Sequence, residues 1–584
     1  MSGWRDLLVR RGPWLALALS VVLCLPAPTG GLFSDDYVHQ LIFEMPKGSI
    51  GGSAPWNFFT FTDGNPAITQ PLIAHGPLMW LTWPKLRMRF MRPLSSLLIF
   101  LDHEVFGKGL AGPHLHSVLW YLALVAVACL LFRRTLGPAG GLLAPVAMLL
   151  FAGDDTHWLA ALWLANRNSL VATAPVLLGL VAHLRWREDG WRPGLWLSLP
   201  CYATGLAGGE AALGALAYLL AYELLAGPGG WKKRLLALAP VGLLGLGYLA
   251  IYKAWNGGAS GSGIYIDPLV SPLSFLAHAP ARALALLGAQ FLASPVDAWL
   301  LAEKSHLALV AVGVLAVLLV GAMLRATWPS IPEPTKRHLR WLLAGSGLSL
   351  VPVLATFPLA RLLLMPGLGA AAAVSALLLY APRRGWLRFG VVVLFITNVA
   401  LAPVGWLTSY LIGRVVVHAH EKMAFETGFT DDELTRRVLL FAAPDAMIGL
   451  YAPMVRMWKG LAPPRAWLCF SLAPYPHRLT RVSADTLELE VEGGHMGETV
   501  FEQITRSHDI GYQQGERVEL DGATVTVIAL EEGLPKRLRI QLTEPLDGDA
   551  YALAQWKGGR LDRLELPAVG QSVELPLTPG ALAF

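Results

Sequence analysis

Long apolar runs, repeated along most of the chain, restrict this sequence more than any other feature. Eleven of them lie near residues 14–28, 114–132, 139–152, 168–184, 194–206, 210–226, 235–253, 306–324, 341–356, 361–381 and 388–409. A helix that crosses a membrane needs about 20 mostly apolar residues. Only 15% of the 584 residues are charged, whereas a soluble domain has about 25%. We therefore expect an α-helical polytopic membrane protein with about eleven transmembrane helices.

Basic residues gather in every second loop between these runs. The clusters are Arg5/Arg10/Arg11, Arg133/Arg134, Arg185/Arg187/Arg192, Lys232/Lys233/Arg234, Lys336/Arg337/Arg340 and Arg383/Arg384/Arg388. Cytoplasmic loops carry an excess of Lys and Arg, so this alternation places the N-terminus in the cytoplasm and the C-terminal region outside. The first 28 residues fit an uncleaved signal anchor. Because the net charge of +5 is divided among short clusters, it does not indicate nucleic-acid binding.

The pattern changes after Tyr410 and divides the chain into three parts. Residues 1–410 form the expected transmembrane domain, with a long first extracytoplasmic loop over 29–112. Residues 411–463 have helical spacing and are expected to form an extracytoplasmic helical connector. Residues 464–584 alternate between apolar and polar, and Asp521-Gly522 between two such runs is a strong hairpin signal. We expect a small β-rich extracytoplasmic domain there.

The loop 254–305 has two distinct pieces. Residues 255–263 are rich in Gly and Ser, a composition typical of a flexible segment. The apolar piece 274–292 could be a re-entrant or interfacial helix, or a further pair of crossings, and the charge pattern favours the first alternative.

Two adjacent carboxylates, Asp35 and Asp36, follow the first apolar helix almost directly. An ionised Asp at the centre of a membrane costs roughly 2.5–3.5 kcal/mol, so we expect the pair at the aqueous interface. One interpretation is that a carboxylate there takes a proton or holds a cation beside a lipid-borne substrate. The alternative is that Ser34 or Asp35 caps a short interfacial helix that runs to about Glu44.

Further polar residues lie at the expected extracytoplasmic ends of the helices. They are Arg92, His157, Trp163, Arg167, Glu210 and Arg361. An unpaired Arg beside an apolar run is costly, and a lipid phosphate would compensate it. The alternatives are an ion pair of Arg167 with a nearby Asp, an Arg92 that extends to the headgroups, and a helix-dipole role for Glu210. A cation at a helix N-terminus is unfavourable, so Arg361 requires an anion or a carboxylate partner.

Five stretches in this order resemble the GT-C class of polyprenyl-phosphate-sugar-dependent glycosyltransferases, with the nearest similarity to the O-mannosyltransferase and TMTC-like branch. The stretches are Asp35-Asp36, Arg92-Pro93-Leu94, His157 with Trp163, Arg167 and Leu170, Glu210, and the run from Arg361 to Gly369. The similarity covers roughly residues 30–380.

The chain also departs from that branch. Ser117 and Tyr121 replace its common Asn and His, Gly209 replaces a Lys, and Ala360 replaces an acidic residue. The C-terminal part has no tetratricopeptide repeats. These departures leave the sugar and the acceptor open.

The resemblance implies an integral-membrane transferase that moves a sugar from a polyprenyl-phosphate donor to an extracytoplasmic hydroxyl, in a bacterial inner membrane. Asp35 or Asp36 would act as general base, with Arg92, Arg167 and Arg361 on the lipid phosphate and His157, Trp163 and Glu210 in support. The scheme requires no cofactor beyond the lipid-linked donor, although it is compatible with a divalent cation shared between carboxylate and phosphate.

Two other classes of function compete with this interpretation. A transporter or flippase of a lipid-linked sugar would have inverted repeats and ionisable residues at mid-span, whereas these polar residues gather at one face. A non-catalytic scaffold would explain the β-rich domain but not the Asp pair beside several Arg residues.

Overall fold

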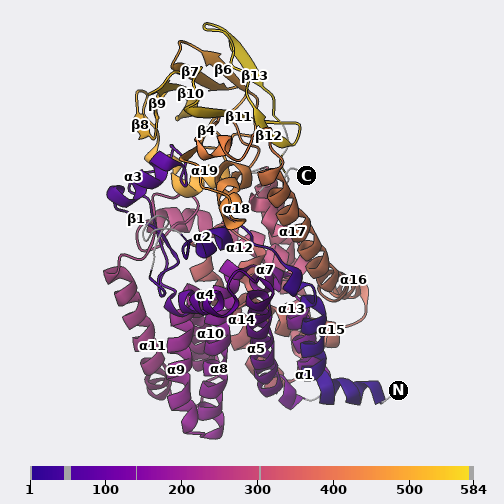
Figure 1. Cartoon of the computed structure of the whole chain (residues 1–584). Helices are drawn as coiled ribbons and strands as arrows, with labels where there is room; N and C mark the ends of the chain where they lie inside the picture. Colours follow the sequence, from indigo (N-terminus) through magenta and orange to yellow (C-terminus); the bar gives the residue numbers. More distant parts are fainter. Residues whose placement is uncertain (1–2, 45–53, 140, 301–303, 578–579, 581–584) are drawn as a thin grey trace.

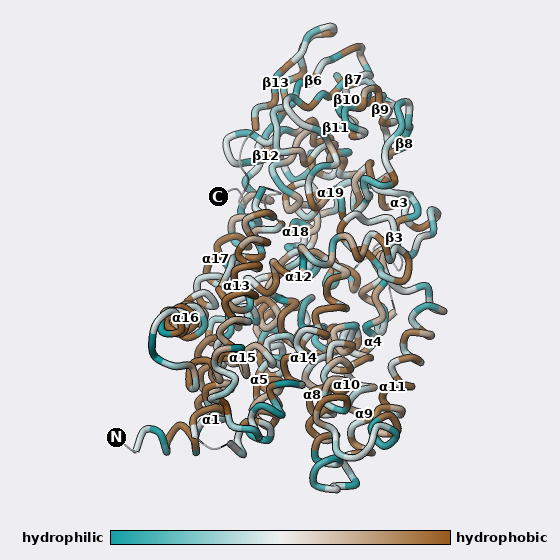
Figure 2. The backbone as a smooth tube through the Cα atoms, turned by 180° about the vertical axis from the view of Figure 1, so that it is seen from behind, coloured by the Kyte–Doolittle hydropathy of each residue, from teal (hydrophilic) through white to brown (hydrophobic). Residues whose placement is uncertain are grey.

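The computed structural model describes residues 3–44, 54–139, 141–300, 304–577 and 580. A bundle of long helices forms one end of the molecule, and a β-rich C-terminal domain covers the other end (Figure 1). We call the end of the bundle that faces this domain the site end. Figure 2 shows that hydrophobic residues follow the bundle helices, while polar residues gather in the loops.

Each of the eleven apolar runs forms a helix or a helical series. The bundle helices are α1 (Gly3–Cys24), α5 (Ala111–Thr135), α6 (Leu143–Ala152), α8 (Arg167–Asp189), α9 (Pro193–Gly208), α10 (Leu213–Leu225), α11 (Trp231–Ala254), α13 (Ser305–Thr327), α14 (Glu333–Val353), α15 (Pro366–Tyr380), α16 (Gly385–Phe395) and α17 (Ala402–Phe425). Within the described residues, seven helical segments are long and apolar enough to cross a membrane, and α6 and α15 are shorter apolar helices. The expected polytopic helical architecture is thus confirmed, whereas the number of crossings and their orientation stay predictions.

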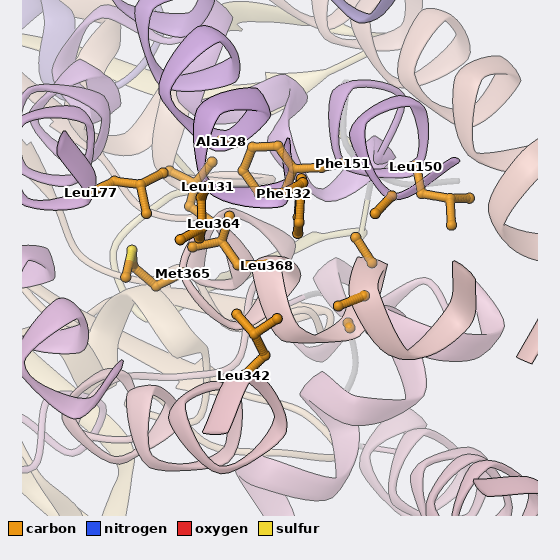
Figure 3. Packing of buried hydrophobic residues seen from close by; sticks show 14 of the residues in the cluster. Ala128, Leu131, Phe132, Leu150, Phe151, Leu177, Leu342, Leu364, Met365 and Leu368 are labelled. Atoms are coloured by element: carbon orange, nitrogen blue, oxygen red, sulfur yellow. The ribbon is translucent and has the colours of Figure 1, made fainter. Parts of the chain in front are cut away.

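The bundle is held together by close packing of apolar side chains. Figure 3 shows Phe132 of α5, Phe151 of α6, Leu177 of α8 and Leu342 of α14 meeting around Leu368 of α15. Small residues let neighbouring helices approach closely, as in other membrane proteins. A side chain at Gly208 of α9, for example, would collide with the backbone of α8 at Ala172.

The first loop folds over the site end of the bundle. It contains α2 (Asp35–Leu41), β1 (Thr60–Asp63), α3 (Pro66–His75), β2 (Arg87–Arg89) and α4 (Pro93–Phe106). The segment expected to be flexible contributes β3 (Gly258–Ser260), which extends the β1–β2 pair to a three-stranded antiparallel sheet. Backbone pairing with β2 therefore orders this Gly-rich stretch.

The apolar piece near 274–292 forms α12 (Pro272–Leu292). Arg282, near its middle, donates to the carbonyls of Ile264 and Leu354, and Gln290, near its end, donates to Asp154. Leu354 and Asp154 follow the ends of α14 and α6, and Ile264 lies in the loop between β3 and α12. The contacts therefore agree with the re-entrant or interfacial alternative, although α12 is long enough to cross a membrane.

The described part of the C-terminal domain contains two sheets. The six-stranded antiparallel sheet has the order β13-β6-β7-β10-β9-β8 and the four-stranded mixed sheet the order β12-β11-β4-β5. The strands are β4 (Arg437–Leu440), β5 (Ala466–Cys469), β6 (His477–Arg481), β7 (Thr486–Val491), β8 (Arg517–Leu520), β9 (Ala523–Glu531), β10 (Leu534–Leu542), β11 (Tyr551–Lys557), β12 (Arg560–Arg563) and β13 (Ser572–Leu575). The predicted Asp521-Gly522 hairpin is present, with Leu520 opposite Ala523.

The segment expected as a helical connector, 411–463, differs in part from that expectation. α17 ends at Phe425, and the connector then forms β4, which pairs in parallel with β5 and β11. All four residues of β4 are buried. A strand buried on both faces is a continuous apolar run without alternation, so its sequence resembles a helix segment. A short helical series follows, ending in α18 (Ala452–Trp458), and α19 (Val500–Thr505) lies between β7 and β8.

The first loop and the C-terminal domain share one hydrophobic core. Tyr37 and Leu41 of α2 pack in the same cluster as Phe441 and Phe470. The indole Nε1 of Trp80 donates to the carbonyl of Phe470 at 2.7 Å. The domain is therefore packed onto the site end of the bundle.

Candidate active site

A cavity of about 330 Å³ lies at the site end of the bundle. It brings together residues that are far apart in the sequence, and five residues predicted for the site line it: Asp35, Arg92, Trp163, Glu210 and Arg361. The lining continues into apolar positions on α10, α11 and α14, among them Leu213, Leu249 and Val353. The cavity thus has a charged part and an apolar part.

Asp35 is the first residue of α2 and its carboxylate faces this cavity. The hydroxyl of Tyr451, which precedes α18, donates to Oδ1 of Asp35 at 3.0 Å. Burial raises the pKa of Asp35 above its ordinary value, although the Tyr451 hydrogen bond and the charges of Arg361 and Arg92 act in the opposite direction. The preceding Ser34 has a φ of 49°, a left-handed conformation that is strained for a residue other than glycine.

Asp36 points away from the cavity. Its Oδ2 accepts the N–H of Phe33 at 3.0 Å, and its Oδ1 accepts the N–H of Ala165 at 2.7 Å. Burial raises the pKa of Asp36 to about 8, and the two N–H groups offset part of that shift. Asp36 therefore connects the start of α2 to the turn before α8.

Arg361 lies in η8, the short helix Ala360–Leu363 that precedes α15. Its guanidinium lies 5.0 Å from the centre of the Trp163 ring, and Nη1 donates to Oδ1 of Asn166 at 3.3 Å. Its Nε is buried and has no hydrogen-bond partner. Among the described residues, no carboxylate lies within salt-bridge distance of Arg361. This guanidinium is therefore available to an anion.

Arg92, directly before α4, is partly neutralised. Its Nε donates to Oε2 of Glu210 at 2.8 Å, and Tyr252 donates to the other carboxylate oxygen at 3.2 Å. The guanidinium also lies 4.9 Å from the ring centres of both Phe59 and Phe90. Arg92 and Glu210 thus form one hydrogen-bonded pair in the wall of the cavity.

Arg167 lies outside the residues that line this cavity. Its Nη1 contacts Oδ2 of Asp102 at 2.5 Å and donates to the carbonyl of Pro113 at 3.2 Å. Asp102 also accepts from His116. The expected alternative of an ion pair is therefore present, with Asp102 of α4 rather than with Asp154 or Asp155.

Trp163 and His157 have different surroundings. Trp163 donates its Nε1 to the carbonyl of Phe33 at 3.0 Å and presents its ring to Arg361. His157 is fully buried, edge-on to Phe151, and does not line the cavity.

Several residues in or beside the cavity were not singled out from the sequence. Tyr451 belongs to the C-terminal region and contacts Asp35 across 416 positions. Tyr265 follows β3 and lies beside Arg361, and Asn166 accepts from that Arg. Tyrosine and asparagine in loops carry no local sequence signal, so only the fold brings them to the site. Within the described ranges, no group of three or more His, Cys, Asp or Glu side chains could hold a metal ion.

No protein-family profile matches the chain, and no curated protein matches its sequence. Among solved structures, it is similar to the crystal structure of ArnT from Cupriavidus metallidurans bound to undecaprenyl phosphate. The identity is 15%, the match covers 92% of this chain and 98% of that chain, and the TM-score is 0.30.

Proposed function

We propose that this protein is an integral-membrane glycosyltransferase that transfers a sugar from a polyprenyl-phosphate donor to a hydroxyl acceptor. The observation that carries the proposal is the composition of a single cavity. It has a carboxylate, Asp35, and two guanidinium groups in one part and apolar residues of membrane helices in the other. A lipid phosphate that bears a sugar has the same division of charged and apolar parts.

The donor phosphate is assigned to Arg361, with Arg92 in a second position. Arg361 has no carboxylate partner within the part of the chain that the structure describes, and hydrogen bonds from an arginine to a phosphate are among the strong ones. Arg92 shares its charge with Glu210. Arg167, held by Asp102, is given a structural role in this scheme.

The lipid chain is assigned to the apolar part of the cavity. Leu213, Leu249 and Val353 come from α10, α11 and α14, and α11 lies at the edge of the bundle in both views (Figures 1 and 2). A polyprenyl chain could therefore reach the cavity sideways from the bilayer.

The proposed reaction is a single displacement with inversion at the anomeric carbon. The acceptor oxygen forms a bond to that carbon while the bond from the carbon to the phosphate oxygen breaks. The hydroxyl proton passes to Asp35, and the polyprenyl phosphate leaves with the electron pair beside Arg361. General-base catalysis of this kind contributes about 10²–10⁴ in rate. The resemblance to the O-mannosyltransferase branch favours a hexose as the sugar.

Binding of undecaprenyl phosphate to the purified protein in lipid nanodiscs tests the donor site. Arg361→Lys keeps the charge but loses the planar fork, so binding should weaken by about tenfold. The matched control is Arg384→Lys, in an exposed loop position that does not line the cavity, and it should bind like the wild type. If the wild type, Arg361→Lys and Arg384→Lys bound undecaprenyl phosphate equally well, the assignment of Arg361 to the donor phosphate would be refuted.

A further inference from the structure

A second cavity, of about 300 Å³, lies between the first cavity and the C-terminal domain. The β3 segment and the start of α12 form one side, and the segment from α19 to Ile510 forms the other. We call it the junction cleft. The two cavities share four lining residues: Ala259, Tyr265, Ile266 and Asp267.

The two sides of the junction cleft are joined by backbone hydrogen bonds. The N–H of Gly263 donates to the carbonyl of Gln503 at 2.8 Å, and the N–H of Ser507 donates to the carbonyl of Gly261 at 2.8 Å. The N–H of Trp83 donates to the carbonyl of Thr505 at 3.0 Å. The C-terminal domain therefore forms a fixed wall of the cleft.

The lining of the junction cleft is polar but contains no Lys or Arg among the described residues. Its hydrogen-bonding side chains are mostly hydroxyl and amide groups: Ser260, Ser262, Ser271, Ser274, Gln503 and Ser507. Two carboxylates, Asp267 and Asp509, and two histidines, His278 and His508, also line it. This surface disfavours an anionic ligand and suits one that is uncharged and rich in hydroxyl groups.

We infer that the junction cleft binds a sugar unit of the acceptor, so that the acceptor is a carbohydrate hydroxyl. This inference rests on the proposed function. Tyr265 belongs to both cavities and its hydroxyl lies beside Arg361, so a sugar in the cleft lies directly next to the donor site. The volume lies at the lower end of the roughly 300–1,000 Å³ of small-molecule sites, which fits one or two sugar rings. The C-terminal domain thus supplies one wall of the acceptor site.

Saturation-transfer NMR on the full-length protein in phosphatidylcholine nanodiscs tests this inference. The probes are the methyl glycosides of glucose, galactose and mannose, with a short Ser/Thr peptide as the alternative class. At least one glycoside should receive saturation from the wild type. Gln503→Ala combined with Asp509→Lys should weaken that binding at least about tenfold, because both side chains face the cleft. Ser274→Tyr, which fills the cleft from the α12 side, should have the same effect.

Glu565→Lys is the matched control, because it changes an exposed carboxylate of the same domain outside the cleft and should leave glycoside binding unchanged. No glycoside signal on the wild type, or signals unaffected by both cleft variants, would overturn the inference. A signal from the peptide alone would overturn the carbohydrate class. Undecaprenyl phosphate binding, measured on the same samples, separates these outcomes from a failure of the proposed function, since that binding depends on Arg361 and not on the cleft.

Discussion

Asp35 and Asp36 are neighbours with opposite surroundings. Asp35 faces the cavity and bonds to the hydroxyl of Tyr451, whereas both oxygens of Asp36 accept backbone N–H groups. In this arrangement Asp35 is free to take a proton from an acceptor, and Asp36 fixes the backbone that presents Asp35.

Replacing each Asp by Asn should separate these two roles. Asp35→Asn should lower turnover by about two orders of magnitude and leave the melting temperature nearly unchanged, because it removes the base. Asp36→Asn loses one of two buried hydrogen bonds and should destabilise the protein by about 1–3 kcal/mol. Turnover and thermal unfolding measured on both variants provide the check. Wild-type turnover in Asp35→Asn would exclude it as the base.

Tyr451→Phe should change the dependence of turnover on pH. A general base works in its ionised form, so activity rises as the pH increases through the pKa of Asp35. The Tyr451 hydrogen bond lowers that pKa, which burial raises. Removing the hydroxyl should therefore move the acid limb of the profile to higher pH.

The control for Tyr451→Phe is Tyr512→Phe. Tyr512 does not line the cavity, and its buried hydroxyl has no hydrogen-bond partner. Its pH profile should match that of the wild type. An unshifted acid limb in Tyr451→Phe would show that Tyr451 does not influence the base.

The sequence could identify the kinds of residue at the site but not all of their partners. In the sequence, Arg361 and Arg167 have the same setting, because each is an arginine beside an apolar run. Only the packing of α4 against α8 decides that Asp102 neutralises Arg167 and leaves Arg361 without a carboxylate. Likewise, no local sequence pattern predicts the hydrogen bond from Tyr451 to Asp35.

Among the elements, the Asp521-Gly522 hairpin was the most predictable because its turn chemistry is local. Gly522 has a φ of 84°, and a Cβ there would lie 2.6 Å from Cδ of Arg437. Arg437 is itself held by Asp521 and Glu544, so it cannot move away freely.

Gly522→Ala should therefore lower the thermal stability of the protein by about 2 kcal/mol or more, from the strained φ together with the collision. Gly570→Ala provides the comparison, since its φ is 83° but no atom lies within 4 Å of an added Cβ. Calorimetry should show a clearly larger loss for Gly522→Ala. Equal losses of stability in the two variants would show that the Arg437 side chain moves away from the added Cβ without destabilising the protein.

Four strands that precede the expected β-rich domain were not predicted, and two of them, β3 and β4, show the physical reasons. β3 lies in a Gly-rich stretch whose order comes from pairing with β2, and β4 is buried on both faces and shows no alternation. Both depend on partners distant in the chain, which periodicity cannot reveal.

At the scale of the whole molecule, the site and the C-terminal domain lie at the same end of the bundle, and α1 begins at the opposite end (Figure 1). The alternating basic clusters predict that the site end faces away from the cytoplasm.

Cysteine labelling in intact cells checks this orientation. A cysteine at Glu565, in the C-terminal domain, should react with a membrane-impermeant maleimide, and one at Arg5, in α1, should react only after permeabilisation. Both positions are exposed. The four native cysteines should first be replaced; none forms a disulfide. The reverse labelling pattern would place the site in the cytoplasm.

The most direct test of the account is the consumption of radiolabelled polyprenyl-phosphate sugars by the purified protein, with membrane glycolipids and glycans supplied as acceptors. We expect that one donor is consumed, that its label appears in a carbohydrate acceptor, and that Asp35→Asn and Arg361→Lys both reduce this transfer. If the wild type transfers label from no donor in a panel of hexose- and pentose-bearing lipids, or if Asp35→Asn transfers it at the wild-type rate, the glycosyltransferase assignment is contradicted.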